Sequence, residues 1–378
     1  MEIKKNTSDY LIALLRATVN GDIPPEKPKD VDWEELLKLA IYHKVEEMAY
    51  ASIIKLKSKP ENEAEALWNK HHNKNQILDM VQQGEADAII KEAAKSGIDI
   101  LPLKGAIMKK MYPKSEFRQM ADLDYLVRPS DIDKIEPIMT KLGYNPDDVG
   151  LEDSHDVYGK PPYMEVEVHR RLLPPTEENH WHTDTIWERL YRDQDNAHLY
   201  HMTWEDYYLF HLLHFEKHYS MGGSGIRSIL DEHYLIETIG NKLDWDYLKK
   251  ILDKMHYTEF ERMCRNLAEA WFGNGEMTKD LEEPAEYIIN SGAFGTFEQY
   301  QKWSYERYKR EQGIRTKKGF FFRRMFMERE RMEFIYPSLK KHPWILPFCW
   351  VHRLVKAVIF NRGRVKIEMK NFRKNDKQ

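Results

Sequence analysis

Thiols are scarce in this chain, whose 378 residues include only two cysteines, Cys264 and Cys349. Two cysteines cannot form a network of disulfides or a four-cysteine zinc site, so they exclude a disulfide-stabilised secreted scaffold and favour a reducing compartment. The first ten residues, MEIKKNTSDY, are polar and lack the apolar segment of a secretory signal. We therefore expect a cytoplasmic protein.

Long uncharged apolar runs are missing too. The longest apolar stretch near the end, residues 344–360, contains His352, Arg353 and Lys356, so we do not expect it to span a membrane. Apolar residues still make up 42% of the chain, with 10 Trp, 21 Tyr and 15 Phe, which is enough to fill the core of a globular protein. The length predicts two or three domains.

Acidic residues are rare after residue 300. Residues 301–378 contain 22 Lys and Arg against 7 Asp and Glu, a net charge of +15, while residues 1–300 carry −19. Cations lie beside aromatic residues in two parts of this basic tail, first at Arg315, Lys317, Lys318, Phe320, Phe321, Phe322, Arg323 and Arg324, and then at Trp344, Trp350, Arg353, Lys356, Arg362, Arg364 and Lys366. Such a tail suits packing against the acidic remainder of the chain, an anionic membrane surface or nucleic acid. Of the external partners we favour peripheral contact with a membrane, because residues 344–360 are apolar and aromatic.

Helical patterns dominate the first ninety residues. Asp32 with Glu35 forms a capping box ahead of an apolar stripe, and this helix is predicted to run to residues 57–60. A second helical pattern runs from about residue 61 to residue 94, and Gly97 stands where a helix cap belongs. Residues 1–96 are therefore predicted to form a helical N-terminal segment.

The periodicity changes after Gly97. Residues 98–103 form a short apolar run of the strand type, which stops at Lys104-Gly105 before a helical AIMKKMY segment. Further strands are predicted at residues 121–127 and in a hairpin of residues 157–158 and 163–169, with a helix starting at Ser130 between them. Later helices are predicted from Thr203 through residue 218 and over residues 226–239.

Acidic residues alternate with apolar ones in two of these strands. Because successive side chains of a strand point to opposite faces, Asp122 and Asp124 share one face, as do Glu165, Glu167 and His169. A third carboxylate joins the first two if the strands are neighbours. Closely spaced carboxylates repel unless a cation neutralises them, and Mg²⁺ binds carboxylate oxygens together with substrate phosphates. The pattern indicates a divalent-metal site for phosphoryl or nucleotidyl transfer, and the alternative is an exposed strand face whose charges never meet.

A phosphate-binding turn is indicated before the DxD pair. Gly105 permits close approach of backbone N–H groups to an anion at the start of a helix, and Lys104 adds a positive charge. Arg118, four residues before Asp122, is suited to donate two hydrogen bonds to a phosphate.

The strings LKGAIMKKMYPKSEFRQMADLDYLV and VEVHRRL resemble the uncharacterised nucleotidyltransferase family of the DNA-polymerase-beta-like nucleotidyltransferase superfamily. HLLHFEKH, GIRSILDEHYL and IYPSLKKHPWILPFCWVHRL also look like the helical half of that family. The resemblance implies a strand, a glycine turn with a helix, a DxD strand and a later strand with one carboxylate. One departure is Ala106, where many superfamily members have Ser.

The resemblance also implies roles for individual residues. Asp122 and Asp124 would hold two Mg²⁺ (or Mn²⁺) ions, and Glu167 would be the third carboxylate, with Glu165 as the alternative ligand. Gly105 would let the backbone hold the terminal phosphates of an NTP such as ATP. The family pattern suggests that three residues of one helix face those phosphates, namely His214, Lys217 and His218. The alternatives for this helix are ordinary packing, or a transition-metal site formed by His211, His214 and His218.

We therefore expect an α+β protein in four parts. These are a helical N-terminal segment (1–96), a nucleotidyltransferase core with a small mixed β-sheet and the metal site (97–175), a helical domain that closes a cleft over it (176–300) and a basic helical C-terminal segment (301–378). Together the last two parts form the larger helical half.

The expected activity is two-metal transfer of a nucleoside monophosphate from an NTP to an acceptor, with release of pyrophosphate. The acceptor could be a sugar or small metabolite, an RNA 3′ end or a protein, because nothing in the sequence identifies it. The alternatives are a catalytically inactive nucleotide-binding protein and an adaptor that acts through its basic tail.

Overall fold

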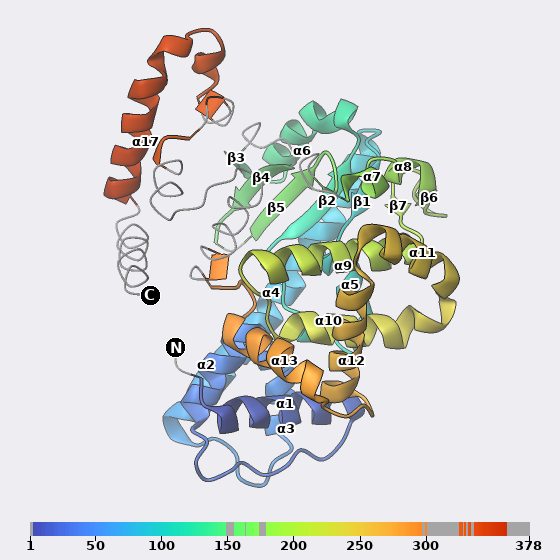
Figure 1. Ribbon diagram of the computed structural model, residues 1–378, viewed down its shortest axis with the longest axis vertical. Helices are drawn as coiled ribbons and strands as arrows, with labels where there is room; N and C mark the ends of the chain where they lie inside the picture. The colour runs from blue at the N-terminus through green and yellow to red at the C-terminus, as the bar shows by residue number, and fades with distance from the viewer. Residues whose placement is uncertain are drawn as a thin grey trace. The chain divides into compact units, whose positions relative to one another are not determined.

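The computed structural model describes residues 3–148, 155–162, 164–173, 179–296, 299–300, 325–327, 329, 332–333 and 336–360. The chain divides into two compact units, Met1–Gly295 and Thr296–Gln378 (Figure 1). Helices and a mixed sheet make up the first unit, which confirms the α+β class. The predicted boundaries after residues 96 and 175 lie within this unit and stay predictions.

Three short helices begin the chain: α1 (Lys5–Asn20), α2 (Trp33–His43) and α3 (Glu46–Ile53). Asp32 caps α2 as predicted, because its Oδ1 accepts hydrogen bonds from the backbone N–H groups of Glu34 and Glu35 at 2.9 Å each. The expectation of one helix reaching residues 57–60 is wrong. Lys44 has φ 58°, and its N–H bonds to the carbonyl of Ala40, which ends α2 in a left-handed turn.

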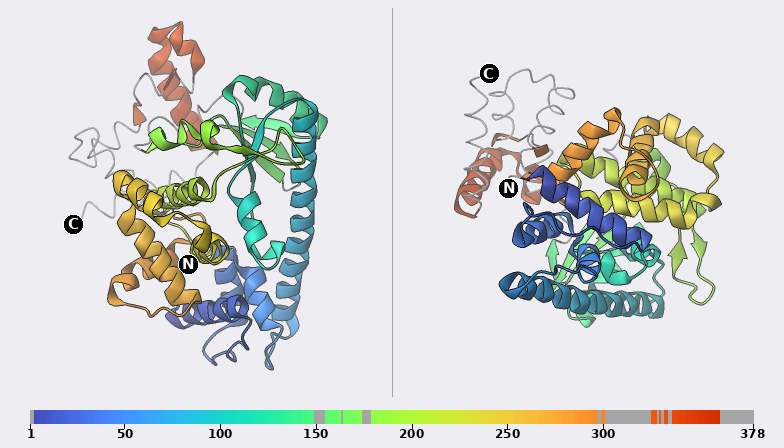
Figure 2. Two further views of the ribbon diagram at one scale, coloured as in Figure 1. Left: turned by 90° about the vertical axis from the view of Figure 1, so that its right-hand side faces the viewer. Right: turned by 90° about the horizontal axis from the view of Figure 1, so that it is seen from below.

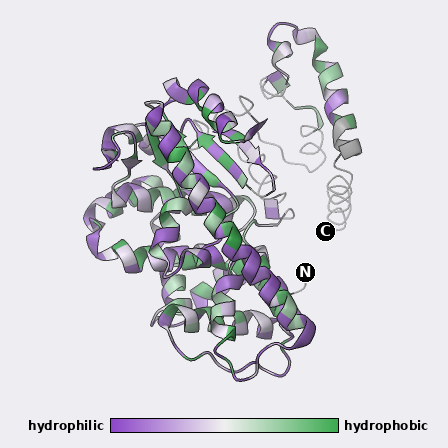
Figure 3. Cartoon of the chain, turned by 180° about the vertical axis from the view of Figure 1, so that it is seen from behind, coloured by the Kyte–Doolittle hydropathy of each residue, from purple (hydrophilic) through white to green (hydrophobic). Residues whose placement is uncertain are grey.

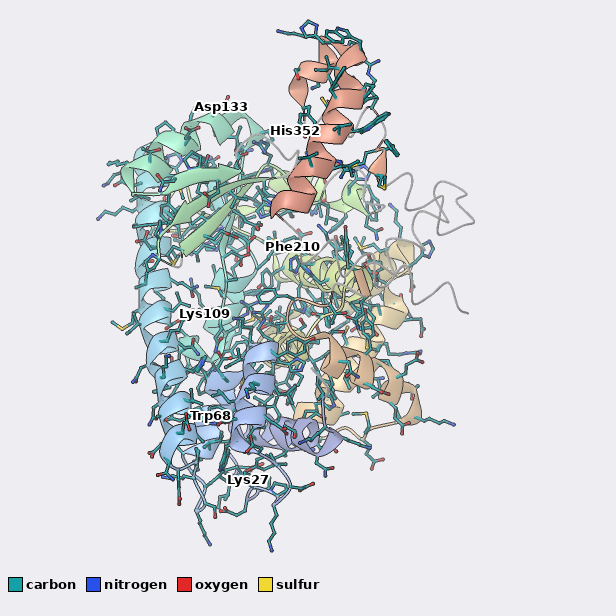
Figure 4. All side chains as sticks on the ribbon, turned by 90° about the vertical axis from the view of Figure 1, so that its left-hand side faces the viewer. Lys27, Trp68, Lys109, Asp133, Phe210 and His352 are labelled. Atoms are coloured by element: carbon teal, nitrogen blue, oxygen red, sulfur yellow. The ribbon has the colours of Figure 1, made fainter. Side chains whose placement is uncertain are left out.

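The long helix α4 (Asn62–Lys95) connects the N-terminal helices with the sheet, as Figure 2 shows. Its 34 residues span about 50 Å. Trp68 near its start packs in the core of the N-terminal helices (Figure 4), whereas Ile89 and Ala93 near its end pack against the sheet. One side of α4 therefore contributes to two different cores, and hydrophobic residues are interspersed with hydrophilic ones along its outer side (Figure 3). Gly97, with φ 68°, follows the end of α4 as predicted.

The sheet has five strands: β1 (Ile100–Pro102), β2 (Leu123–Val127), β3 (Asn145–Asp148), β4 (His155–Lys160) and β5 (Met164–His169). Their order is β1-β2-β5-β4-β3. β2 and β5 are parallel and the other neighbours are antiparallel, so the sheet is mixed as predicted. The hairpin of β4 and β5 is also confirmed, whereas the edge strand β3 was not predicted.

The two faces of the sheet have different neighbours. Leu123, Tyr125 and Val166 point to one face, where they pack with α4 and α6 (Ile135–Lys141). Asp124 and Glu167 occupy alternate positions and so point to the other face.

The helical segment after β2 begins differently from the prediction. Pro129 starts a 3₁₀ turn, η3 (Pro129–Lys134), which leads into α6, whereas Ser130 was expected to cap an α-helix.

Small elements precede the later helices: α5 (Gly105–Met108), η1 (Lys109–Met111) and η2 (Ser115–Phe117) before β2, and α7 (His180–Thr183), α8 (Ile186–Arg189), β6 (Tyr191–Arg192) and β7 (Tyr200–His201) after β5. The predicted AIMKKMY helix is thus only one turn of α-helix followed by a 3₁₀ turn. This segment is held against α4, because the ammonium group of Lys109 in η1 (labelled in Figure 4) pairs with Asp79 of α4.

The later helices of the first unit are α9 (Trp204–Met221), α10 (Ile226–Ile239), η4 (Gly240–Lys242), α11 (Trp245–Met255), α12 (Thr258–Phe272) and α13 (Lys279–Ser291). The predicted cap of α9 is present, because Thr203 Oγ1 accepts a hydrogen bond from Asp206 N at 3.1 Å. Leu14 of α1 and Leu212 of α9 belong to the same buried cluster. The N-terminal and later helices therefore share one core.

The described part of the second unit contains η5 (Pro337–Lys340), η6 (Pro343–Ile345) and α17 (Leu346–Phe360). Met332, Leu339 and Cys349 form its small core. None of the helices within the described residues is long and apolar enough to cross a membrane. Many cations of the basic tail lie outside the described residues, namely Arg315, Lys317, Lys318, Arg323, Arg324, Arg362, Arg364 and Lys366.

Candidate active site

Three carboxylates come together on one face of the sheet. Asp124 in β2 lies opposite Glu167 in the parallel strand β5, and Asp122 directly precedes β2. One oxygen from each of the three carboxylates lies within 4.8 Å of the others. The structure therefore brings together the three residues that the sequence suggested as metal ligands. Glu165, the alternative ligand, is exposed and stands outside this group.

Two cationic side chains contact the carboxylates directly. Lys104 Nζ lies 2.7 Å from Asp124 Oδ1, and His169 Nε2 lies 3.0 Å from the same oxygen. His169 Nε2 also lies 3.2 Å from Glu167 Oε2. Asp124 is only 4% exposed, so these contacts are what stabilise its charge. In contrast, Asp122 makes no hydrogen bond or ion pair within the described part of the chain.

The unequal pairing gives the carboxylates opposite pKa shifts. Burial, with the neighbouring charge of Asp124, raises the pKa of Asp122 to about 6. Burial also acts to raise the pKa of Asp124, but Lys104 and His169 outweigh it and lower that pKa. The hydrogen bond from His169 lowers the pKa of Glu167. Of the three carboxylates, Asp122 thus has the negative charge that is least stabilised by neighbouring positive charges.

Lys104 is held in an uncommon backbone conformation at the edge of this group. Its φ of 39° and ψ of −110° cost roughly 1–3 kcal/mol for a residue with a side chain. The carbonyl of Lys104 accepts a hydrogen bond from the Tyr207 hydroxyl of α9 at 2.9 Å, which fixes this turn. Burial lowers the pKa of Lys104, but Asp124, Glu167 and Asp122 outweigh burial and raise it. Lys104 therefore remains charged.

Gly105 follows Lys104 where a side chain would displace Met120 and Arg118. A Cβ atom at Gly105 would lie 2.3 Å from Met120 Sδ and 2.7 Å from Arg118 Nη1. Close packing thus explains the glycine, whether or not a phosphate approaches it. The helix after it, α5, has only four residues, so it offers much less of a helix dipole than the sequence pattern suggested.

Arg118 lies in a buried cluster beneath this turn. Its Nε and Nη2 donate hydrogen bonds of 2.9 Å each to the two carboxylate oxygens of Asp231 in α10. Tyr112 donates a third, of 2.7 Å, to Asp231 Oδ1. Arg118 and Asp231 are 8% and 5% exposed. Two of the N–H groups that could bind a phosphate are already bonded to Asp231, and the rest of the guanidinium is buried. This geometry favours a structural role for Arg118 over the predicted phosphate contact.

Arg227 is a candidate cation that the sequence did not indicate. Arg227 and Asp231 stand four residues apart on α10, but Asp231 pairs with Arg118, and Arg227 Nη1 donates to the Gln119 carbonyl at 3.0 Å. Its Nε is buried with no hydrogen-bond partner among the described residues. The charge of Arg227 acts on Asp122, where it lowers the pKa against the effect of burial. Spacing alone could not show which way this side chain points.

The predicted histidines of α9 lie beside the site. His214 Nε2 and His218 Nε2 are 3.0 Å apart, with His218 exposed and His214 half-buried. Burial, followed by the charges of Lys104, His218 and Lys217, lowers the pKa of His214 well below its ordinary value. His211 is directed elsewhere, because its Nε2 lies 3.2 Å from Glu232 Oε2 in α10. The three histidines His211, His214 and His218 therefore do not form one metal site.

His155 of β4 is a further candidate ligand that sequence analysis missed. It lies opposite His169 in the antiparallel pair of β4 and β5, with ring centroids 5.0 Å apart. His155 Nε2 lies 4.0 Å from Glu167 Oε2, and His155, Glu167 and His169 each offer one ligand atom within 4.8 Å of the others. Glu167 therefore belongs to two groups, one with oxygen ligands alone and one with two imidazoles.

The chain belongs to the family of uncharacterised nucleotidyltransferases, because the sequence model of that family matches residues 29–273. All the site residues described above lie within the matched range. It does not extend to residues 335–354, where we also expected a resemblance. No curated protein matches the chain.

One solved structure is similar to part of the chain, the solution structure of the antibiotic-resistance factor ANT(2'')-Ia. The sequences are 11% identical, and the TM-score is 0.37. The similarity covers 49% of this chain and 97% of that one.

Proposed function

We propose that the protein transfers a nucleoside monophosphate from an NTP to an acceptor hydroxyl in a reaction that requires a divalent metal. The observation that carries this proposal is the convergence of Asp122, Asp124 and Glu167 within 4.8 Å on one sheet face. Membership in a nucleotidyltransferase family supports the reaction class. Metal dependence, the site residues and the acceptor are part of the proposal.

The donor set fits a divalent cation. Among the described residues, Lys104 and His169 make the close cationic contacts with the three carboxylates, and the raised pKa of Asp122 reports negative charge that these two do not compensate. Mg²⁺ or Mn²⁺ held by Asp122, Asp124 and Glu167 would supply the compensating positive charge and polarise the phosphates of the NTP. The imidazole of His155, near Glu167, adds one nitrogen donor, which favours Mn²⁺ over Mg²⁺.

The chain's own residues divide the remaining tasks. The acceptor oxygen attacks the α-phosphorus, its proton passes to a carboxylate oxygen of Glu167, and the bond from the α-phosphorus to the pyrophosphate oxygen breaks. Lys104 and Arg227 stabilise the negative charge that develops on the leaving pyrophosphate. Gly105 shapes the turn that presents Lys104, while His214, Lys217 and His218 of α9 line the side from which the phosphates enter.

The acceptor stays open among a sugar or small metabolite, an RNA 3′ end and a protein. A second candidate function is nucleotide binding without turnover, which Ala106 favours because it offers no hydroxyl to the phosphates. In that case the backbone and Lys104 would bind the NTP, but no label would move to an acceptor.

Incubation with each α-labelled NTP, Mg²⁺ or Mn²⁺ and cell extract tests the proposal by following label into an acceptor. Asp124→Asn and Glu167→Gln remove charges that hold the metal, so each should lower transfer at least about 100-fold. Glu165→Gln is the matched control on the same strand face and should transfer normally. Full transfer by Asp124→Asn would exclude the proposal, whereas metal-dependent NTP binding with no transfer would favour the non-catalytic alternative.

A further inference from the structure

An apolar side of the second unit faces solvent. Four residues with helical spacing stay exposed there, namely Trp344 (72%), Phe348 (69%), Val351 (60%) and Val355 (50%). We name these four residues the α17 surface. The opposite side of the helix packs on the core of the unit, where Cys349 is 7% exposed. Figures 1 and 3 show α17 and its hydrophobic residues, and Figure 4 marks the neighbouring His352. Large apolar side chains aligned on one exposed side indicate an interaction surface.

The sequence that contains this surface carries charge of one sign. Residues 334–367 contain no Asp or Glu. The same stretch contains seven cationic residues, Lys340, Lys341, Arg353, Lys356, Arg362, Arg364 and Lys366. Lys340 and Lys341 are exposed next to η6, at the end of the surface that carries Trp344. The partner must therefore offer an apolar layer directly beneath a negative surface.

We propose that the α17 surface binds the interface of an anionic membrane, with the helix lying in the plane of the headgroups. An amphipathic helix with Trp and Phe on its apolar side and Lys and Arg around it binds in this way, because apolar burial and attraction to anionic lipids add together. No helix of the described residues can cross the bilayer, which agrees with contact at the surface.

Other partners fit less well. A second copy of the chain would bring Lys340 and Lys341 close to their own counterparts, and these charges would repel. A nucleic acid would match the charge but would leave Val351 and Val355 against a polar backbone. The proposal does not depend on the transfer reaction, since every residue of the α17 surface lies outside the range matched by the nucleotidyltransferase family.

Sedimentation of the full-length protein with vesicles tests the proposal. Vesicles of phosphatidylcholine mixed with phosphatidylserine should bind the protein, binding should weaken with salt, and vesicles of phosphatidylcholine alone should bind little. Phe348→Ser with Val351→Ser should weaken binding at least about tenfold through lost apolar burial. Lys340→Gln with Lys341→Gln should weaken it about fivefold per lysine at low salt.

Matched controls come from the first unit. Lys249→Gln with Lys250→Gln changes an exposed lysine pair on α11, and Ile77→Ser with Met80→Ser removes apolar side chains that are 64% and 73% exposed on α4. Both controls should bind like the unchanged protein. The proposal is overturned by absence of vesicle binding or by equal loss in the controls. It is equally overturned if the protein binds tRNA rather than vesicles with a dependence on Lys340 and Lys341 alone, which would assign the surface to nucleic acid.

Discussion

The first unit holds two dense charge clusters that meet at Lys104 and Gly105 and differ in how completely they are paired. In the closed cluster, Arg118 and Tyr112 satisfy both oxygens of Asp231. In the open cluster, Asp122, Asp124 and Glu167 share the positive charges of Lys104 and His169, and Asp122 has no direct partner within the described residues. The closed cluster joins the turn before β2 to α10, whereas the open cluster keeps binding capacity for a cation.

The difference shows how to tell a structural charge from a functional one. Burial acts to raise the pKa of both Asp231 and Asp122. Arg118 reverses this effect at Asp231, whose pKa is lowered, but nothing reverses it at Asp122, whose pKa rises to about 6. A carboxylate that the fold itself disfavours in its charged form points to a missing ligand.

The largest expected effect comes from breaking the closed cluster. Asp231→Asn leaves the buried guanidinium of Arg118 without a counter-charge, so we expect a loss of about 3–5 kcal/mol in the free energy of unfolding. Arg118→Met combined with Asp231→Leu removes both charges and should cost much less. Urea unfolding of the two variants measures the difference. If Asp231→Asn has the same free energy of unfolding as the unchanged protein, the Arg118–Asp231 pair does not stabilise the contact between α10 and the turn before β2.

A substitution in the open cluster, Asp122→Asn, should have a smaller effect of opposite sign on the free energy of unfolding. The folded pKa of Asp122, about 6, lies above its ordinary value of 3.8. Protonated Asp122 therefore stabilises the fold fully below about pH 4, and this contribution is lost as the pH rises through about 6. Asp122→Asn removes the cost of the charge, so in EDTA at pH 8 the variant should be about 1–3 kcal/mol more stable than the unchanged protein, and near pH 4 about equally stable.

Urea unfolding at the two pH values measures this gain. Reduced stability of Asp122→Asn at pH 8 would mean that the Asp122 carboxylate has a stabilising partner in the folded protein. The comparison of the two clusters would then fail, because Asp122 would resemble Asp231.

The sequence predicted those parts of the fold that depend on local periodicity. The spacing of apolar residues located α4 and α10, and alternation placed Asp122, Asp124 and Glu167 on strand faces. Local patterns could not reveal the end of α2, because Lys44 adopts a left-handed conformation that lysine rarely takes. The edge strand β3 escaped prediction because its sequence, NPDD, has no apolar alternation.

Contacts between residues that lie far apart in the sequence could not be predicted from it. Arg118 and Asp231 are 113 positions apart, whereas helical spacing alone would pair Asp231 with Arg227, one turn away on the same helix. His155 joins Glu167 only through the register of β4 with β5, which a hairpin pattern does not fix by itself. The carboxylates could thus be predicted because they lie in strands or directly before one, whereas their cationic partners depend on tertiary packing.

Metal-dependent stabilisation by nucleotide tests the central claim most directly, because it needs no acceptor. With Mg²⁺ or Mn²⁺ and an NTP at about 100 times its Kd, the melting temperature should rise by an amount that corresponds to about 2.7 kcal/mol. An NTP with EDTA should produce little change, and Asp122→Asn should lose the metal-dependent rise although it is the more stable protein without metal. An equal rise in EDTA, or an unchanged rise in Asp122→Asn, would contradict the assignment of the three carboxylates to a metal and nucleotide site.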